Sequence, residues 1–407
     1  MQTNANAACW TGRNALGRLG VTAVFFFLGA TAGTWAARIP AVKGQLHLSA
    51  GTLGLCLLGP ALGAAIAMPA AGALLATMPP RRVVQFAVVT VGLLPATTLV
   101  TSPWELFLVL VGWGVGLGTV DVGMNTQAAA LQAHLGRRIM ARFHAAFSGG
   151  LLVGSGLGAL AAAERLSARV DFALAAVVVY VATLASAQTF ERYHARRENS
   201  QAASARERRW PTWSAKLAAI AVISFAAFLA EGAVSDWSAV YLHSSLGASL
   251  GVAALGFTGF SCVMTCSRLA GDRLADFAGP VRLIRVSASV AALALAGALI
   301  ISRVWAGIAG FGLLALGLAS VVPLAFSSAA QLGRQGPNLA FVTTCGYVGM
   351  LAGPAMIGGI AEEVGLPGAL GVVVALTVLI AVLAGALRPN SALRDALPPP
   401  PADIVIR

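Results

Sequence analysis

The sequence predicts an all-α membrane protein of about twelve transmembrane helices, arranged as two pseudo-symmetric six-helix halves. Of its 407 residues, 58% are hydrophobic and only 10% are charged, whereas an average soluble domain is about 25% charged. The apolar residues form long blocks, such as Leu53 to Ala76 and Gly371 to Ala386. Blocks of roughly 17 to 25 residues are helices that span a bilayer, and the alternating pattern of transmembrane strands is missing from them.

Each predicted span is an apolar block between more polar residues. In the first half the spans fall at 18–37, 51–76, 83–101, 104–128, 143–163 and 170–190. In the second half they fall at 215–238, 250–268, 281–302, 304–330, 339–361 and 366–387. The longest polar stretch, Glu191 to Lys216, separates the two sets. We therefore expect an amino-terminal half at 1–190, a linker at 191–214 and a carboxyl-terminal half at 215–407 with a short tail.

The basic residues predict the orientation of these spans. With the amino terminus inside, all but five of the 27 Lys and Arg residues fall on the cytoplasmic side, as the positive-inside rule requires. The exceptions are Arg38, Lys43, Arg165, Arg169 and Arg303. The sequence thus predicts an inner-membrane protein with both termini in the cytoplasm. Its net charge of +12 reflects topology and not the binding of nucleic acid. A cleaved signal peptide over Val21 to Ala32 is the disfavoured alternative, because cleavage would remove a helix of the repeat.

Similar features recur roughly 200 residues apart, which favours a parallel repeat of six helices. The recurring pairs are Trp35 with Trp237, Gly51 with Gly251, Gly72 with Gly271, and Gly118 with Gly317.

Polar segments after the second and eighth spans carry a recognisable pattern. Gly72 is followed by Ala76, Arg81 and Arg82 in the first, and Gly271-Asp272-Arg273 stands in the second. These segments resemble the signature G-x-x-x-D-R-x-G-R-R of the major facilitator superfamily, with Ala76 in place of the first aspartate. The resemblance covers essentially the whole chain. It implies transport by alternating access, with Asp272 and Arg273 in a gating loop.

A closer resemblance is to a bacterial subfamily that is allied to sugar-proton symporters. It is carried by Trp35 to Pro40, Asp121 to Gln127, Met140 to Gly150 and Glu231 to Ser238. This resemblance implies uptake of a polar or sugar-like solute, while proton-coupled efflux of apolar compounds is the alternative.

Two carboxylates inside the predicted spans, Asp121 and Glu231, are candidates for proton coupling. A charge at the centre of a spanning helix costs about 2.5 to 3.5 kcal/mol on insertion scales. Each carboxylate is therefore expected to have a role that offsets this cost. Asp121 shares a helix face with Asn125, and Gln127 lies alongside. Glu231 has no cation close in sequence on its helix, which favours a protonatable group. The alternative for both is a hydrogen bond or an ion pair that only positions helices.

Gating pairs are expected at both ends of the bundle. At the outer end, Arg38 and Asp236 are predicted to form an ion pair that latches the closed state; unrelated rim charges are the alternative. At the inner end, Arg142 and His144 are the expected partners of Asp121, although His144 could instead cap its helix.

Tryptophans and glycines suggest further roles. Trp35 is a candidate either to stack on a sugar-like ring or to anchor in the membrane interface, and Trp237 is expected to anchor in the interface. The glycine-rich fifth and eleventh spans predict close packing of helices.

The sequence argues against an enzyme. Its histidines never pair at metal-ligand spacing, and its carboxylates do not cluster at one depth. The sequence has no phosphate-binding P-loop, so an ion gradient is the expected energy source and protons are favoured. We expect no cofactor and no metal. The expected partners are a small-molecule solute, protons and the lipid bilayer, with a monomer as the working unit.

Overall fold

The computed structural model describes residues 2–135, 139–190, 213–332 and 335–388, and the regular structure in these ranges is entirely helical. The helices of the first group are α1 (Gln2–Gln45), α2 (Ala50–Cys56), α3 (Leu58–Leu75), α4 (Pro80–Val91), the 3₁₀ helix η1 (Leu94–Thr98), α5 (Pro103–Leu135), α6 (Met140–Ala163) and α7 (Ala168–Ala187). Those of the second group are α9 (Ala215–Val240), the π-helix η2 (Tyr241–Ser245), α10 (Leu250–Ala278), α11 (Pro280–Ile301), α12 (Val304–Leu318), α13 (Val321–Ala330), α14 (Gln335–Leu383) and η3 (Ala384–Leu387). The predicted all-α class is confirmed.

The described residues make about twelve crossings. Ten of their helical segments are long and apolar enough to span a membrane. One of these holds two crossings, because Gly365 (φ 75°, ψ 164°) divides α14 into two helices. A further crossing is made by α4 together with η1. This agrees with the number of helices predicted from the sequence.

Several predicted helix boundaries are wrong. The eighth span continues to Ala278, where Gly279 (φ 77°) and Pro280 end it. Glycine reaches positive φ without strain and proline cannot continue the hydrogen-bond ladder, so the helix stops there and not at Arg268. The first span belongs to the much longer α1. Predicted spans 51–76 and 304–330 are each divided, into α2 with α3 and into α12 with α13.

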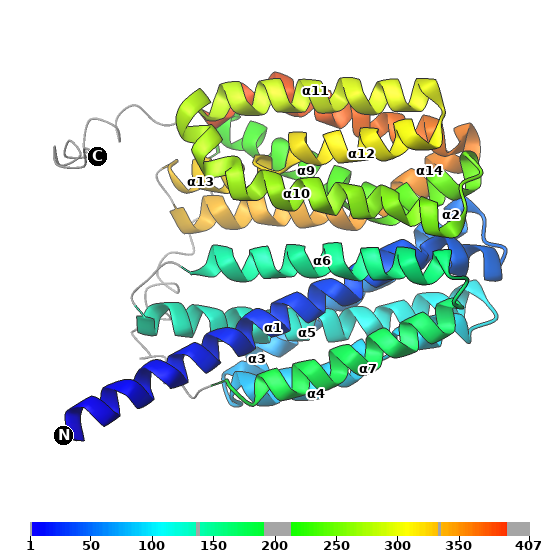
Figure 1. Cartoon of the computed structure of the whole chain (residues 1–407). Helices are drawn as coiled ribbons and strands as arrows, with labels where there is room; N and C mark the ends of the chain where they lie inside the picture. Colours follow the sequence, from blue (N-terminus) through cyan, green and yellow to red (C-terminus); the bar gives the residue numbers. More distant parts are fainter. Residues whose placement is uncertain (1, 136–138, 191–212, 333–334, 389–407) are drawn as a thin grey trace.

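The beginnings of α1 and α9 lie on the same side of the bundle as the ends of α7 and η3 (Figure 1). Lys216 Nζ donates a hydrogen bond to the Arg388 carbonyl oxygen at 2.8 Å, which joins the start of α9 to the end of η3. Gly20 on α1 packs against Thr189, just beyond α7. We call this the termini side and the other the opposite side.

The same turn occurs on the opposite side at equivalent places of the two groups, and a third one, at Arg165 (φ 58°) with its Ser167 cap, precedes α7. His47 and Gly247 have φ values of 51° and 71°. Two residues later, the Ser49 and Ser249 side chains accept hydrogen bonds from backbone N–H groups in the first turns of α2 and α10. Serine caps of this kind satisfy N–H groups that a helix start leaves free. These equivalent turns are consistent with an internal repeat.

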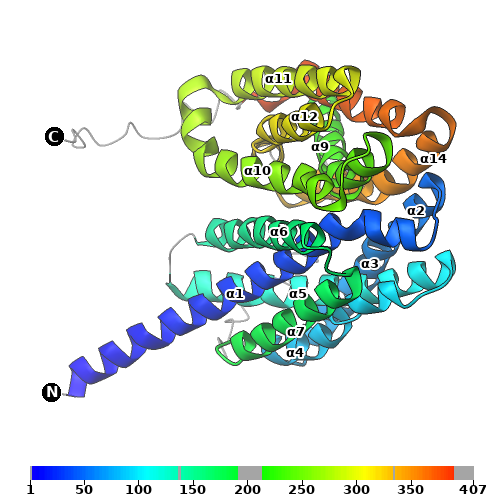
Figure 2. The same ribbon diagram turned by 45° about the vertical axis from the view of Figure 1, so that its right-hand side comes forward.

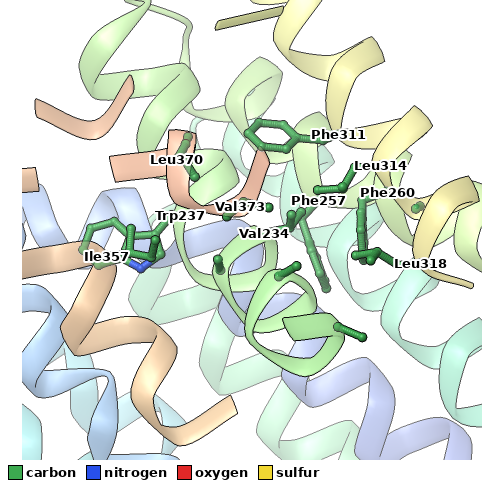
Figure 3. Packing of buried hydrophobic residues seen from close by; sticks show 14 of the residues in the cluster. Val234, Trp237, Phe257, Phe260, Phe311, Leu314, Leu318, Ile357, Leu370 and Val373 are labelled. Carbon is green, nitrogen blue, oxygen red and sulfur yellow. The ribbon is translucent and has the colours of Figure 1, made fainter. Parts of the chain in front are cut away.

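The two groups of helices are distinct in Figure 2, and they meet where α2 lies beside α14. One buried cluster joins Trp35, Leu53 and Trp113 of the first group to Trp237 and Tyr241 of the second. Figure 3 shows its second-group part, where α9, α10, α12 and α14 contribute apolar side chains. Another cluster lies toward the termini side and is built from first-group residues alone.

Close packing joins the groups on the opposite side. A Cβ on Gly54 would lie 2.5 Å from the Pro354 carbonyl oxygen, and one on Gly251 would lie 2.9 Å from the Ala163 backbone nitrogen. Such distances leave no room for a side chain. The groups are therefore closed against each other on the opposite side.

Glycines also pack helices together within each group, as the sequence predicts. Gly150 and Gly154 of α6 abut the backbone of α1, and Gly349 of α14 abuts the Phe225 carbonyl of α9. Small residues at such crossings let backbones approach closely.

Candidate functional site

The central feature is an ion pair between Glu231 of α9 and Arg268 of α10. Arg268 Nη2 lies 3.3 Å from Glu231 Oε1 and 3.5 Å from Oε2. Glu231 lies about 24 Å along α9 from Ala215, and Arg268 about 27 Å along α10 from Leu250. The pair therefore sits well inside the bundle. The side chain of Glu231 is still 33% exposed and that of Arg268 is 36% exposed.

The pair reaches the other group of helices through α6. Arg268 Nη1 donates a hydrogen bond to Ser148 Oγ at 3.4 Å, and Ser148 Oγ donates one to the His144 carbonyl oxygen at 3.2 Å. His144 lies within electrostatic reach of Arg268, and its ring meets Phe25 edge-on at 5.4 Å. We call Glu231, Arg268, Ser148 and His144 the central polar cluster. It joins α6 of the first group to α9 and α10 of the second.

Asp121 has a different partner from the one predicted. Asn125 Nδ2 donates hydrogen bonds to the Asp121 carbonyl oxygen at 2.9 Å and to its Oδ1 at 3.1 Å. The ion pairs among the described residues are Glu231–Arg268 and Arg38–Asp171, so an ion pair of Asp121 with Arg142 or His144 is not formed. His144 lies with Arg268 because its face of α6 turns toward α10. Tyr347 of α14 lies within electrostatic reach of Asp121.

Arg38 pairs with Asp171 instead of Asp236. Arg38 Nε lies 3.3 Å from Asp171 Oδ2, and its Nη2 donates a hydrogen bond to the Leu166 carbonyl oxygen at 2.5 Å. The two side chains are 3% and 10% exposed. Because α1 and α7 belong to one group, this pair holds that group together and does not join it to the other. The predicted Arg38–Asp236 contact is therefore wrong for this conformation.

The polar contact that does join the groups on the opposite side is made by Glu362 of α14. Its Oε1 accepts a hydrogen bond from the Gly51 backbone N–H, at the start of α2, at 2.6 Å. The Ser49 side chain and Lys43 both lie within electrostatic reach of this carboxylate. A carboxylate at a helix start is favoured by the free N–H groups and by the helix dipole. This contact exists only while the opposite side is closed.

The remaining predicted residues are spread over the fold. Trp35 is 4% exposed and its ring packs 5.9 Å from Trp113, so its surface is covered by protein here. Trp237 is fully buried, which contradicts its predicted place in the membrane interface. Gln127 is also buried. The other predicted residues have these positions: Arg142 is exposed at the start of α6, Asp236 is partly buried on α9, and Asp272 and exposed Arg273 lie within α10 and not in a loop.

Residues 20–336 match the sequence profile of the Major Facilitator Superfamily. The chain belongs to this superfamily. It is therefore a multi-pass membrane transporter and not an enzyme.

Relatives and solved structures agree with this membership. An uncharacterized MFS-type transporter of Yersinia pestis is 34% identical over 367 residues, which cover 89% of this chain and 94% of the relative. Membrane protein MosC of Rhizobium meliloti is 32% identical over 370 residues, 89% of each chain. The solved structures of the nucleoside transporter NupG and a D-xylose-proton symporter each give a TM-score of 0.68 at 14% identity, covering 91% of this chain and 98% of theirs. They share the superfamily fold.

Three polar residues of this superfamily member were missed by sequence reasoning. Arg268 was placed at the end of a span and counted with the cytoplasmic charges, whereas α10 continues past it. Asp171 was overlooked because it stands near a predicted helix start. Glu362 falls in the short predicted loop between spans 339–361 and 366–387. A search for every charged residue within one helical turn of a predicted span end would have found all three.

Proposed function

We propose that this transporter takes up a small polar, sugar-like solute together with protons by alternating access. The Glu231–Arg268 pair carries the proposal, because it lies deep in the bundle and bonds to Ser148 of the other group. An ionisable pair at such depth costs free energy on insertion, so it is expected to serve transport.

A proton on Glu231 would remove the negative charge that Arg268 pairs with. Arg268 would then be free to donate its N–H groups to oxygen atoms of a solute, since a guanidinium has five donors. Binding of the solute and of the proton would thereby favour each other. The hydroxyl of Ser148 and the nearby imidazole of His144 add further polar groups. Such a lining suits a solute rich in hydroxyl groups, which is the kind named for the D-xylose-proton symporter.

The charge distribution supports cytoplasmic termini in the inner membrane, because the positive-inside rule then accounts for most of the 27 Lys and Arg residues in the sequence. In that orientation the closed opposite side faces the periplasm. Rocking of the helix groups about the central polar cluster would open the opposite side and break the Glu362–Gly51 contact.

Purified protein in proteoliposomes that contain a pH-sensitive dye tests the proposal. We expect D-xylose or uridine, tried first in a panel of sugars and nucleosides, to drive proton entry. The Glu231→Gln variant should lose proton entry and gradient-driven accumulation but keep solute exchange, because its neutral amide mimics the protonated acid. Glu164→Gln, at an exposed acid between α6 and α7, is the matched control.

Two results would contradict the proposal. Full accumulation by Glu231→Gln would move proton coupling elsewhere, with Asp121 next. Failure of every polar solute in the panel, together with proton-driven export of an apolar dye, would replace uptake by efflux.

A further inference from the structure

A groove of about 590 Å³ runs between α11 and the last part of α14. These two segments lie side by side in Figures 1 and 2. Arg285 and Ser289 line one part of it, and Leu293, Ala296 and Val378 line the rest with other small apolar residues. This groove lies outside the central polar cluster and its residues have no part in the proposed transport step.

The groove matches one leaflet of a bilayer in length and polarity. Arg285 lies about one and a half turns from Pro280, the first residue of α11 on the termini side. From Arg285 to Ala296 the groove extends about 16 Å along the helix, and half of a hydrocarbon core is about 15 Å. Its charged end is thus at headgroup level, while its apolar end reaches the membrane centre.

Apolar side chains that flank the groove are exposed, as they would be toward lipid. Leu293 is 74%, Val382 is 68% and Val378 is 46% exposed. A surface of this kind cannot face water, because exposed apolar patches larger than a few hundred Å² are rare on soluble proteins. Lipid chains are the natural cover for this part of the bundle.

The charged end of the groove is cationic. Neither ion pair of the described residues involves Arg285, whose Nη2 lies near Gly385 of η3. Arg282 is exposed one turn earlier on α11, and exposed Asp276 on α10 is the acid nearest in sequence. Basic residues between transmembrane helices on one face attract anionic headgroups.

We propose that this groove binds an anionic phospholipid from the leaflet on the termini side. Its phosphate would accept hydrogen bonds from the Arg285 guanidinium and the Ser289 hydroxyl. One acyl chain would lie along Leu293, Ala296 and Val378.

Native mass spectrometry of the full chain in detergent tests this, using phosphatidylglycerol and phosphatidylcholine with identical acyl chains. One basic residue at a membrane surface is worth about a fivefold preference for anionic lipid, so we expect phosphatidylglycerol to bind at least that much more tightly. Arg285→Gln should reduce this preference to near unity. Arg303→Gln, an exposed arginine at the start of α12 on the opposite side, should leave it unchanged.

A second variant tests the acyl track by itself. Ala296→Phe fills the groove from within, so it should weaken the binding of both lipids equally. This variant tests the groove even where Arg285→Gln fails to fold. Equal binding of both lipids to the unmodified protein would overturn the proposal, as would an undiminished preference in Arg285→Gln. A dimer that dissociates on Ala296→Phe substitution, with no lipid retained, would assign the groove to a second copy of the chain instead.

Discussion

Replacing Asp171 with asparagine should destabilise the first group of helices without opening the transporter. The substitution keeps the shape of the side chain but removes the charge opposite Arg38. Arg38 is 3% exposed, and in this structure its Nε and Nη1 have no well-aligned hydrogen-bond acceptor. Its Nη2 keeps the Leu166 carbonyl oxygen. The variant therefore leaves a buried cation with one backbone acceptor.

The size of the effect follows from burial. Breaking a buried ion pair by removing one partner costs about 3 to 5 kcal/mol, because the remaining charge is uncompensated. The Leu166 carbonyl oxygen and the asparagine oxygen can still accept hydrogen bonds from Arg38. We therefore expect Asp171→Asn to lower the free energy of unfolding by about 3 kcal/mol, the lower end of that range. In the double variant with Arg38→Gln the lone charge is gone, and about 2 kcal/mol of the loss should be recovered as coupling energy.

Unfolding in mixed detergent micelles, followed by circular dichroism, measures these free energies. Glu164→Gln, an exposed acid close to α7, should change stability by less than about 0.5 kcal/mol. Labelling of a cysteine on the opposite side reports opening, and it should stay at the level of the unmodified protein in Asp171→Asn. A loss of stability under about 1 kcal/mol in Asp171→Asn would refute a buried ion pair. So would a double variant whose loss equals the sum of the losses in the two single variants. Increased labelling would show instead that Arg38 latches the two groups.

Three other substitutions test the contacts described above. Glu362→Gln should raise cysteine labelling on the opposite side, because an amide binds the start of α2 less well than a carboxylate does. An equal rise in labelling in the neighbouring control Glu363→Gln would contradict this. Gly349→Val should abolish folded protein, because any Cβ there meets the backbone of α9, and normal yield after purification would show that the helices can separate. Asp121→Asn should slow transport yet keep its pH dependence, since the Asn125 hydrogen bond can survive; a flat pH profile of uptake in this variant would make Asp121 the proton site.

The number of crossings could be read from the sequence for a physical reason. Each span needs about 20 apolar residues, and that requirement is local. Packing by glycine is also visible, because Gly150 and Gly154 repeat at a spacing that places both on one helix face. The break at Gly365 falls in the gap between the predicted spans 339–361 and 366–387.

Partners between helices could not be read in the same way. Sequence reasoning paired Arg38 with Asp236 because both stand at span ends on the same side, but depth alone does not say which helix is adjacent. The position of α7 against α1 decides in favour of Asp171. Likewise Glu231 has no cation close in sequence on its own helix, and its partner Arg268 comes from another helix, which the sequence predicts to end at that residue.

The continuity of α10 connects the central polar cluster to closure of the opposite side. This helix carries Arg268 in the cluster and Gly251 against Ala163 near the opposite side, with helical geometry from Leu250 to Ala278. Because α10 is one continuous helix, a shift of Arg268 that follows loss of the Glu231 charge would be transmitted to the Gly251 contact. The Ser148 bond would oppose that shift while Glu231 is ionised, because it ties Arg268 to α6. Protonation and solute binding would therefore act on both contacts through one helix.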